Sequence, residues 1–325
     1  MPIGRVFFAL AALILLFVAE LGFGPAGLTL AETLSALTAE DSSGASYIVW
    51  ELRMPRALMA CMAGAGLAIS GATLQGLFRN PLADPGLLGV SAGSALGAVV
   101  AIVLLGSGSF VALALGSVAG AGAVLFVLLS LSVLHADNSR VLLAGIALNA
   151  TIAAFIAVLS VIASEAELRS ATFWMLGSTA RAEWLGVAVL AVLLPACLVA
   201  LVIDARKLDI LAVGESAAWQ LGVDVSKLRF RMLLVTALLT AGVVSLCGVI
   251  GFVGLIVPHV LRLLFGPLHR TLILESAAWG AVLLMAADLL SRMVAVPAEL
   301  PIGIITALVG GPFFLVLLLR REVLR

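Results

Sequence analysis

Three arginines are the side chains of this sequence best suited to bind another molecule. Arg53 and Arg56 lie close together near the start of one apolar run, and Arg292 ends a later one. A guanidinium group can hold a carboxylate through two parallel hydrogen bonds, so these residues are candidates for docking an acidic protein surface. Two other interpretations stay open: contact with lipid headgroups, and local pairing with Glu51 and Asp288.

The residue patterns of an enzyme are missing. Lys207 and Lys227 lie outside any G-x-x-x-x-G-K-[ST] sequence, so we do not expect this chain to hydrolyse ATP. His135, His259 and His269 occur without C-x-x-C or H-E-x-x-H spacing, so no bound metal is expected. Because no Ser/His/Asp arrangement is readable either, the sequence predicts no catalytic residue.

The composition indicates a membrane protein. Hydrophobic residues make up 63% of the chain and charged residues 11%, whereas a soluble domain carries about 25% charged residues. A bilayer crossing needs about 20 apolar residues. The recurrent apolar runs therefore predict an all-α polytopic membrane protein with about ten transmembrane helices, in a single transmembrane domain over residues 1–325. The runs cover about 6–24, 56–77, 89–105, 111–134, 141–162, 184–203, 231–249, 252–266, 272–293 and 301–320.

Three details refine this prediction. The third and eighth runs are short, so we expect tilted, broken or buried helices there. The first run follows Arg5 as in a signal peptide, but no small-residue cleavage site follows closely, and we expect a retained span. Cys61, Cys197 and Cys247 all fall inside apolar runs, which favours packing residues over a disulfide framework.

Basic residues are distributed unevenly between the two sides that these runs define. Thirteen of the 18 Lys and Arg residues fall on the side of the chain termini, and five fall on the other side. The positive-inside rule therefore predicts that both termini are cytoplasmic. The outer five are Arg53, Arg56, Arg169, Arg181 and Arg292.

Long segments outside the runs occur on both sides. The outer segments 25–52 and 163–183 can form short surface helices. The inner segment 204–230 is amphipathic and can form helices that lie on the membrane or dock a cytoplasmic partner, with a solvated connector as the alternative. The tryptophans that suit an outer interfacial belt are Trp50, Trp174 and Trp184.

The centres of the runs lack acidic residues. Glu20, Glu275 and Asp288 lie near predicted span ends, whereas ion-coupled transporters usually place acids near the middle of the bilayer. The sequence therefore favours an energy source on a partner. In the short eighth run, His259 follows Pro258. We interpret it as part of a kinked helix in which the histidine satisfies neighbouring backbone groups, with a ligand or proton-handling site as the alternative.

Seven motifs in order along the chain resemble the signature of FecCD-type ABC importer permeases for iron-siderophores, haem and cobalamin. The first joins R-M-P-R at 53–56 to S-G-A-T-L-Q-G-L-F-R-N-P-L-A-D-P-G-L-L-G-V-S-A-G at 70–93. The others are S-R-V-L-L-A-G-I-A-L at 139–148, F-W-M-L-G-S at 173–178, G-E-S-A-A-W-Q-L-G-V at 214–223, C-G-V-I-G-F-V-G-L-I-V-P-H-V-L-R at 247–262, A-D-L-L-S-R at 287–292 and E-L-P-I-G-I-I-T-A-L-V-G-G-P-F-F at 299–314.

This resemblance implies a type II ABC importer permease fold and a homodimer in a bacterial inner membrane. Two ATPase subunits, which carry ATP-Mg, would dock at the cytoplasmic side, and one periplasmic substrate-binding protein at the outer side. The chain itself would be a transport subunit and not an enzyme, with no cofactor of its own and no nucleic-acid partner. Haem or another iron chelate such as a siderophore, or cobalamin, would pass from periplasm to cytoplasm by alternating access.

The resemblance also assigns roles to residues, group by group. Docking of the binding protein would involve Arg53, Arg56 and Arg292. Coupling to the ATPase would use the 204–230 segment, with an E-x-A-A-x-x-x-G core made by Glu215, Ala217, Ala218 and Gly222 but without the I-x-L-P ending of the broader importer motif. A cytoplasmic gate would lie near Asn138 and Ser139. The remaining motif residues, with structural roles, would be Gln75, Asn80, Pro81, Pro85, Pro258 and His259.

Two functions of other classes remain as alternatives. An ion-coupled secondary transporter would need no ATPase. A membrane scaffold that transports nothing would tolerate changes around Glu215. Among the cargoes, overall resemblance around F-R-N-P-L-A-D-P-G-L-L-G favours haem or another iron chelate.

Overall fold

The computed structural model describes residues 3–38, 44–133 and 138–319, apart from a few side chains near the ends of these ranges. Its elements are α1 (Ile3–Gly22), α2 (Leu30–Thr38), α3 (Gly44–Tyr47), the π-helical turn η1 (Ile48–Arg53), α4 (Met54–Phe78), the 3-10 turn η2 (Pro85–Leu88), α5 (Val90–Val103), α6 (Phe110–Val133), α7 (Asn138–Ile162), α8 (Glu165–Met175), α9 (Trp184–Val213), α10 (Glu215–Gln220), α11 (Val225–Cys247), α12 (Val253–Phe265), α13 (His269–Met293) and α14 (Ile302–Leu319).

The all-α prediction is confirmed, because each apolar run coincides with one helix. In the described part of the chain, seven helical stretches are long and apolar enough to cross a membrane, and α5, α12 and α14 are shorter apolar helices. The runs expected to be short are α5 and α12. A helix of 13 or 14 residues is shorter than a full bilayer crossing, so ten complete crossings remain a prediction.

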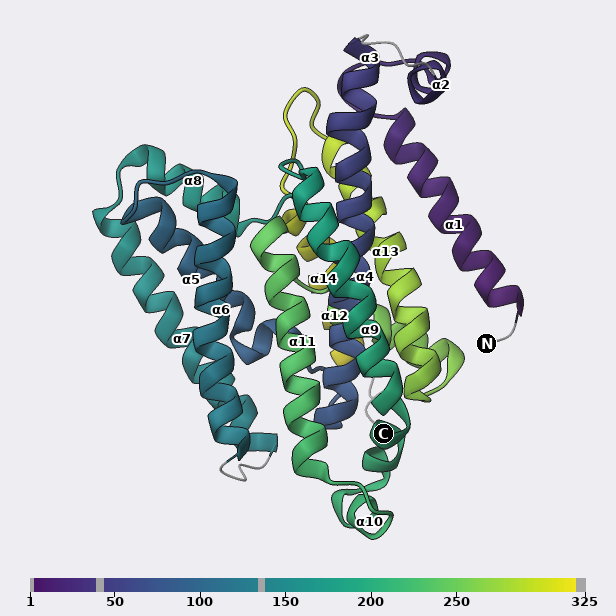
Figure 1. The fold of residues 1–325 in the computed structure, drawn as a ribbon, viewed down its shortest axis with the longest axis vertical. Helices are drawn as coiled ribbons and strands as arrows, with labels where there is room; N and C mark the ends of the chain where they lie inside the picture. The colour runs from purple at the N-terminus through teal and green to yellow at the C-terminus, as the bar shows by residue number, and fades with distance from the viewer. Residues whose placement is uncertain (1–2, 39–43, 134–137, 320–325) are drawn as a thin grey trace.

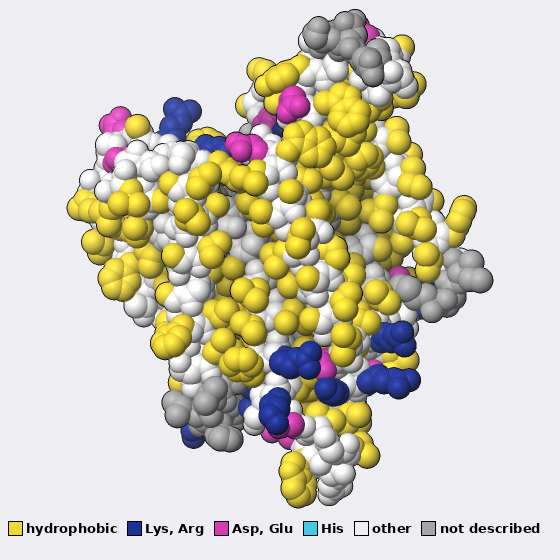
Figure 2. All heavy atoms as spheres, viewed as in Figure 1, with side chains coloured by type: hydrophobic (Ala, Val, Ile, Leu, Met, Phe, Trp, Pro, Cys, Tyr) yellow, Lys and Arg dark blue, Asp and Glu magenta, His cyan; other side chains and the backbone are white. Residues whose placement is uncertain are grey.

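The helices form an elongated bundle with two distinct ends (Figure 1). We call them the α8 end, which also carries α2 and α3, and the α10 end. Figure 2 shows apolar side chains over the middle of one face and most of the visible Lys and Arg side chains toward the α10 end. The α10 end therefore corresponds to the side predicted to be cytoplasmic.

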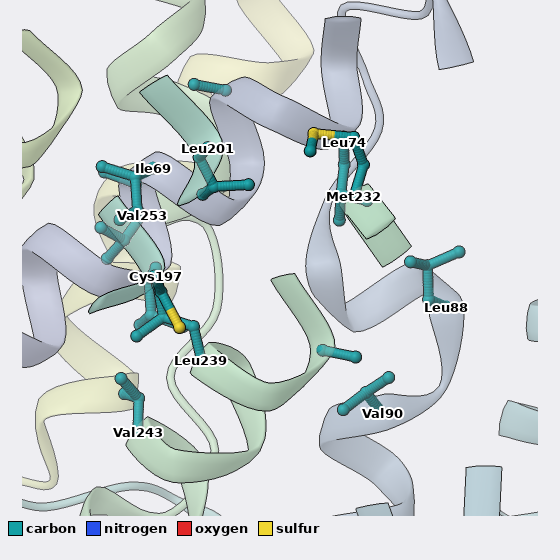
Figure 3. Close-up of a cluster of buried hydrophobic side chains, with 14 of the residues drawn as sticks. Ile69, Leu74, Leu88, Val90, Cys197, Leu201, Met232, Leu239, Val243 and Val253 are labelled. Carbon is teal, nitrogen blue, oxygen red and sulfur yellow. The ribbon is translucent and has the colours of Figure 1, made fainter. Parts of the chain in front are cut away.

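Helix α4 is the centre of the bundle. Within its most apolar window 83% of the residues are buried, against 17% for α1 and for α7. It packs against α13, α9, α11 and α12. Buried side chains from these helices, such as Ile69, Leu201, Leu239 and Val253, form the apolar core (Figure 3). Helices such as α1 and α7 keep a broad apolar face for lipid or a partner chain.

Small residues let the backbones around α4 approach closely. A Cβ atom at Gly64 would collide with the Gly280 carbonyl of α13, and one at Gly71 with the Gly254 carbonyl of α12. In lipid, helices gain little from hydrophobic burial against each other and associate through such close contacts. Gly93 of α5 meets Gly120 of α6 in the same way, with 2.6 Å between an added Cβ and the carbonyl oxygen.

The inner segment 204–230 is mostly helical, which agrees with the first of its two interpretations. Helix α9 continues to Val213, and its 30 residues span about 45 Å, which exceeds the roughly 30 Å of hydrocarbon. The extension is stabilised by Asp204, which pairs with Lys207 at 2.7 Å and with Arg231 of α11 at 3.1 Å. The predicted end of this helix near residue 203 is therefore wrong, since α9 ends at Val213. Hydropathy indicates where a helix leaves the lipid, and a helix can continue beyond that point.

Candidate functional site

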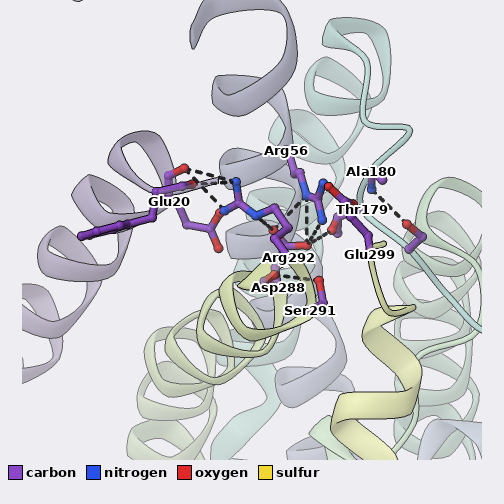
Figure 4. A network of polar contacts seen from close by, with 10 residues as sticks. Glu20, Arg56, Thr179, Ala180, Asp288, Ser291, Arg292 and Glu299 are labelled. Carbon is purple, nitrogen blue, oxygen red and sulfur yellow. Dashed lines mark hydrogen bonds and ion pairs between the residues drawn. The ribbon is translucent and has the colours of Figure 1, made fainter. Parts of the chain in front are cut away.

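A buried ion network at the α8 end joins α4, α13 and the segment before α14 (Figure 4). Arg56 of α4 holds Asp288 of α13 through two N–H donors, with Nε 3.0 Å from Oδ2 and Nη2 3.1 Å from Oδ1. Its third nitrogen, Nη1, lies 2.8 Å from Glu299 Oε2. Asp288 has no exposed surface, while the Glu299 side chain is 34% exposed. The guanidinium therefore connects a buried carboxylate to a half-exposed one.

Arg292 extends the network to α1. Its guanidinium pairs with Glu20, which is fully buried, and its Nε lies 3.3 Å from Asp288 Oδ2. The Thr179 hydroxyl, from the loop after α8, donates to Asp288 as well. A buried charge is costly unless it is paired and hydrogen-bonded. Each buried charge of the network has a partner of opposite charge, but the Glu20 carboxylate oxygens and Arg292 Nε have no hydrogen-bond partner in the described part of the chain.

The sequence predicted part of this network. Asp288 and Arg292 stand four residues apart on α13, the spacing at which opposite charges meet on a helix. Pairing of an outer arginine with Asp288 is confirmed, whereas Glu51 pairs with no residue in the described ranges. Glu20 and Glu299 were missed as partners, because only tertiary packing brings residues so distant in sequence to the same arginines.

The three predicted docking arginines lie at the same end of the bundle, but they are buried. Relative exposure is 4% for Arg53, 9% for Arg56 and 2% for Arg292. Arg53 donates to the Leu21 carbonyl at the end of α1. Docking therefore remains a prediction, and it requires a binding protein to reach side chains that already have partners within this chain.

Backbone segments from three motifs join beside the ion network. The Gly303 N–H donates to the Leu176 carbonyl at 3.1 Å, and the Ser178 N–H donates to the Cys247 carbonyl at 2.7 Å. Gly248 has φ +70°, and a Cβ there would collide with the Trp174 carbonyl. Irregular backbone inside a membrane bundle must satisfy its polar groups within the protein. The F-W-M-L-G-S, C-G-V-I-G-F and E-L-P-I-G motifs thus build one junction.

Helix α12 is held to α4 by Gln75. Pro258 has no backbone N–H, so the Gly254 carbonyl four residues earlier lacks its usual donor within the helix. The Gln75 amide donates to the carbonyls of Gly254 and Leu255 instead, each at 3.3 Å. His259 is 3% exposed, and neither ring nitrogen has a hydrogen-bond partner among the described residues. The expectation that His259 satisfies the backbone of the kinked helix is therefore wrong, since Gln75 has that role.

The turn between α4 and α5 is built by the motif residues at 79–89. Asn80 and Leu82 flank Pro81, and the Asn80 side chain accepts a hydrogen bond from the Leu82 N–H at 2.9 Å. Pro85 begins η2 after Asp84, whose side chain accepts from Gly86. Asn80, Pro81 and Pro85 thus lie in the turn, and their assigned roles as motif residues stay a prediction.

Helix α10 carries the predicted coupling residues. Glu215 pairs with Arg229 of α11 at 3.0 Å. Ala217 is half-buried, Ala218 is buried against the bundle, and Gly222 ends the segment at φ +78°. Asp224 caps α11, and hydrogen bonding from the Lys227 N–H lowers the pKa of its carboxyl group.

Two large apolar side chains lie at this position; the sequence indicated Leu221 as part of the amphipathic pattern of 204–230 but did not single out Trp219. Trp219 is 77% exposed and Leu221 is 68% exposed, beyond the last turn of α9. A six-residue helix that displays such side chains past the membrane-crossing helices is a suitable contact surface for another protein.

Other predicted site residues are only partly described. Asn138 and Ser139 begin α7, but their side chains, like the whole of His135, lie outside the described residues. Within the ranges that the structure describes, no three His, Cys, Asp or Glu side chains come together as a group that could hold a metal ion.

Comparison with known proteins identifies the family. The pattern of the FecCD transport family matches residues 12–320. The chain is 41% identical over 318 residues to the hemin transport system permease protein of Yersinia pestis, covering 95% of this chain and 94% of that one. It is 44% identical over 284 residues to the cobalamin import system permease protein of Halobacterium salinarum, covering 86% and 75%. A solved transporter assigned to the metal-chelate ABC type, in an inward-facing conformation, matches with a TM-score of 0.86 and 32% identity over 97% of this chain and 98% of that one. The chain therefore belongs to the FecCD transport family.

Proposed function

We propose that this chain is the permease subunit of an ATP-driven importer that moves haem or another iron chelate, or cobalamin, from periplasm to cytoplasm by alternating access. The observation that carries the proposal is a match over nearly the whole chain. Relatives named for hemin and cobalamin transport align with at least 86% of it, and a metal-chelate transporter shares its fold over 97%.

The proposed complex contains two copies of this chain, two ATPase subunits and one periplasmic binding protein, in a bacterial inner membrane with both chain termini cytoplasmic. ATP-Mg is bound by the partner subunits. Coupling of this kind requires a two-state element on which both partners act, and no reaction centre in this chain. Gating near Asn138 and Ser139 and a pathway beside α7 and α14 belong to the same proposal.

Docking of the binding protein is proposed to proceed by exchange of ion-pair partners. Glu299 is the half-exposed member of the network and lies 2.8 Å from Arg56. A carboxylate of the binding protein could displace Glu299 while Asp288 keeps the arginine in place. Because the contact would be charged, its affinity should fall as the salt concentration rises.

Coupling to the ATPase is proposed to occur through α10. The Glu215–Arg229 ion pair joins α10 to α11, and Trp219 with Leu221 would fill an apolar groove on the partner. Replacing Trp219 by Ala should therefore abolish ATP-dependent uptake while the chain still dimerises. A scaffold that does not transport would show no such dependence.

The proposal is tested by uptake into proteoliposomes that contain the full chain with its co-purified ATPase and binding protein. We expect hemin, ferric siderophore or cobalamin to enter only with ATP on the side of the ATPase, and not under a proton gradient alone. The three cargoes are compared in parallel, since relatives named for different cargoes share 41% and 44% identity with this chain.

Two results would contradict the proposal. Uptake by the chain alone in a proton gradient would indicate an ion-coupled secondary transporter. Purification without any ATPase, together with uptake that is insensitive to Trp219→Ala and Glu215→Ala, would indicate a scaffold. The Lys227→Ala variant is the control, because the exposed Lys227 side chain pairs with the exposed Asp224 beside the proposed contact.

A further inference from the structure

A crevice of about 950 Å³ opens at the α8 end. Helices α8 and α9, the end of α11, the segment around η1 and residues 299–301 line it. It lies where α6 and α9 begin and where α11 ends, which is the depth of the membrane–water interface for helices that cross the bilayer. Tyr47, Trp174 and Trp184 on its walls are the side chains typical of that depth.

Three charged side chains in this crevice have no partner in the described part of the chain. Glu51, Arg181 and Glu183 all line it and are exposed, and no hydrogen bond or ion pair engages their charged groups. In the ion network that adjoins the crevice through Glu299, by contrast, both Arg56 and Arg292 are paired. The crevice therefore presents two unpaired carboxylates and one unpaired guanidinium to whatever occupies it.

The walls below the charges are apolar. Leu113, Leu185 and Leu246 line the crevice, and exposed apolar side chains follow Leu185 at helical spacing along the same face of α9. These side chains are Val189 and Val192. A ligand with a charged head and long apolar chains would match both parts of the surface.

We propose that the crevice binds the headgroup of a zwitterionic aminophospholipid. The guanidinium of Arg181 holds the phosphate, and the carboxylates of Glu51 and Glu183 hold the ammonium group, beside aromatic rings that also attract a cation. A phospholipid whose headgroup carries no ammonium group would leave both carboxylates unpaired. An anionic cargo would be repelled by the same two carboxylates. The inference does not depend on which cargo is carried.

Glu299 connects this lipid site to the ion network. Its side chain lines the crevice while it binds Arg56 at 2.8 Å. An ammonium group in the crevice would lie near the carboxylate of Glu299. The occupant would thus contact the same carboxylate that the proposed docking of a binding protein displaces.

Native mass spectrometry of the full chain tests the proposal. The chain is released from nanodiscs of equimolar phosphatidylethanolamine and phosphatidylglycerol with matched acyl chains. We expect phosphatidylethanolamine to be retained preferentially, and Arg181→Gln or the Glu51→Gln, Glu183→Gln pair to lower that retention by about tenfold, the loss of one charge-assisted contact. Ser170→Trp, which places an indole in the crevice without changing charge, should lower it too.

The matched control is Glu165→Gln, which changes an exposed charge on α8 outside the crevice and should leave retention unchanged. Glycerophosphoethanolamine, which has the headgroup but no acyl chains, should not displace the lipid at equal concentration. Equal retention of phosphatidylglycerol, retention unaffected by all the crevice variants, displacement by hemin, or no retained lipid would each overturn the proposal.

Discussion

Asp288 accepts hydrogen bonds from Arg56 and Thr179 and lies 3.3 Å from the Nε of Arg292. It is the carboxylate shared by both buried arginines, and it has no exposed surface. Glu299 binds the same Arg56 but keeps a third of its side chain in contact with solvent. The two acids therefore share Arg56 as a partner but differ in burial, and only Asp288 also contacts Thr179 and Arg292.

This difference gives a prediction at the scale of single residues. Asp288→Asn should destabilise the folded chain by about 3–5 kcal/mol, because two buried guanidinium groups lose their shared counter-charge. Glu299→Gln should cost less than about 1 kcal/mol, since a partly exposed pair contributes little. Denaturation of the purified chain in detergent by SDS titration measures both. Equal losses for the two variants would mean that burial does not decide the strength of these pairs.

Arg56→Glu and Arg292→Glu are poor tests of docking for the same reason. Each would place a new carboxylate against Asp288, so weaker binding of a partner could reflect a disrupted α8 end. Glu299→Gln, compared with wild type, separates a loss of docking from a disrupted α8 end. This substitution frees one donor of Arg56 without removing the arginine.

At the scale of elements, α12 depends on α4 for one hydrogen bond that its own sequence cannot make. Pro258 leaves the Gly254 carbonyl without an intrahelical donor, and the buried Gln75 amide takes that place at 3.3 Å. Close contact between Gly71 and Gly254 allows the amide to reach the carbonyl.

Gln75→Leu should therefore destabilise the chain by about 1–3 kcal/mol, the cost of an unsatisfied buried polar group. In a Pro258→Ala background the new backbone N–H at position 258 can serve the Gly254 carbonyl, so the same change at Gln75 should cost less. A double-mutant cycle on SDS denaturation measures the coupling. An identical cost of Gln75→Leu in both backgrounds would show that the freed carbonyl is not what Gln75 satisfies.

At the scale of the whole molecule, charge separates the two ends. Orientation follows from the excess of basic residues at the α10 end, so α8 should face the periplasm and α10 the cytoplasm. Glu165→Cys on α8 and Ser216→Cys on α10 place thiols at exposed positions on opposite ends. The native thiols of Cys61, Cys197 and Cys247 are buried or half-buried, which keeps the background low.

In spheroplasts, a membrane-impermeant maleimide should label Glu165→Cys at once, and Ser216→Cys only after the membrane is permeabilised. The wild-type chain supplies the background. Labelling of Ser216→Cys in intact spheroplasts, with Glu165→Cys protected, would reverse the proposed orientation and place α10 out of reach of a cytoplasmic ATPase.

The sequence by itself determined the class of the protein. Apolar length located the ten helices, and the motifs, read in order, identified the family to which the chain belongs. These signals are local along the chain, because each rests on composition or on short spacing. The i,i+4 relation of Asp288 and Arg292 could be read for the same reason.

Only the tertiary structure decided which distant residues become partners. It buried the three arginines expected at a docking surface, paired Arg292 with Glu20, and gave Gln75 the role expected of His259. It also extended α9 beyond the apolar run, because Asp204 found cations on two helices. Pairing across hundreds of residues depends on how helices pack, and a periodic apolar pattern specifies which face is buried without specifying against which neighbour.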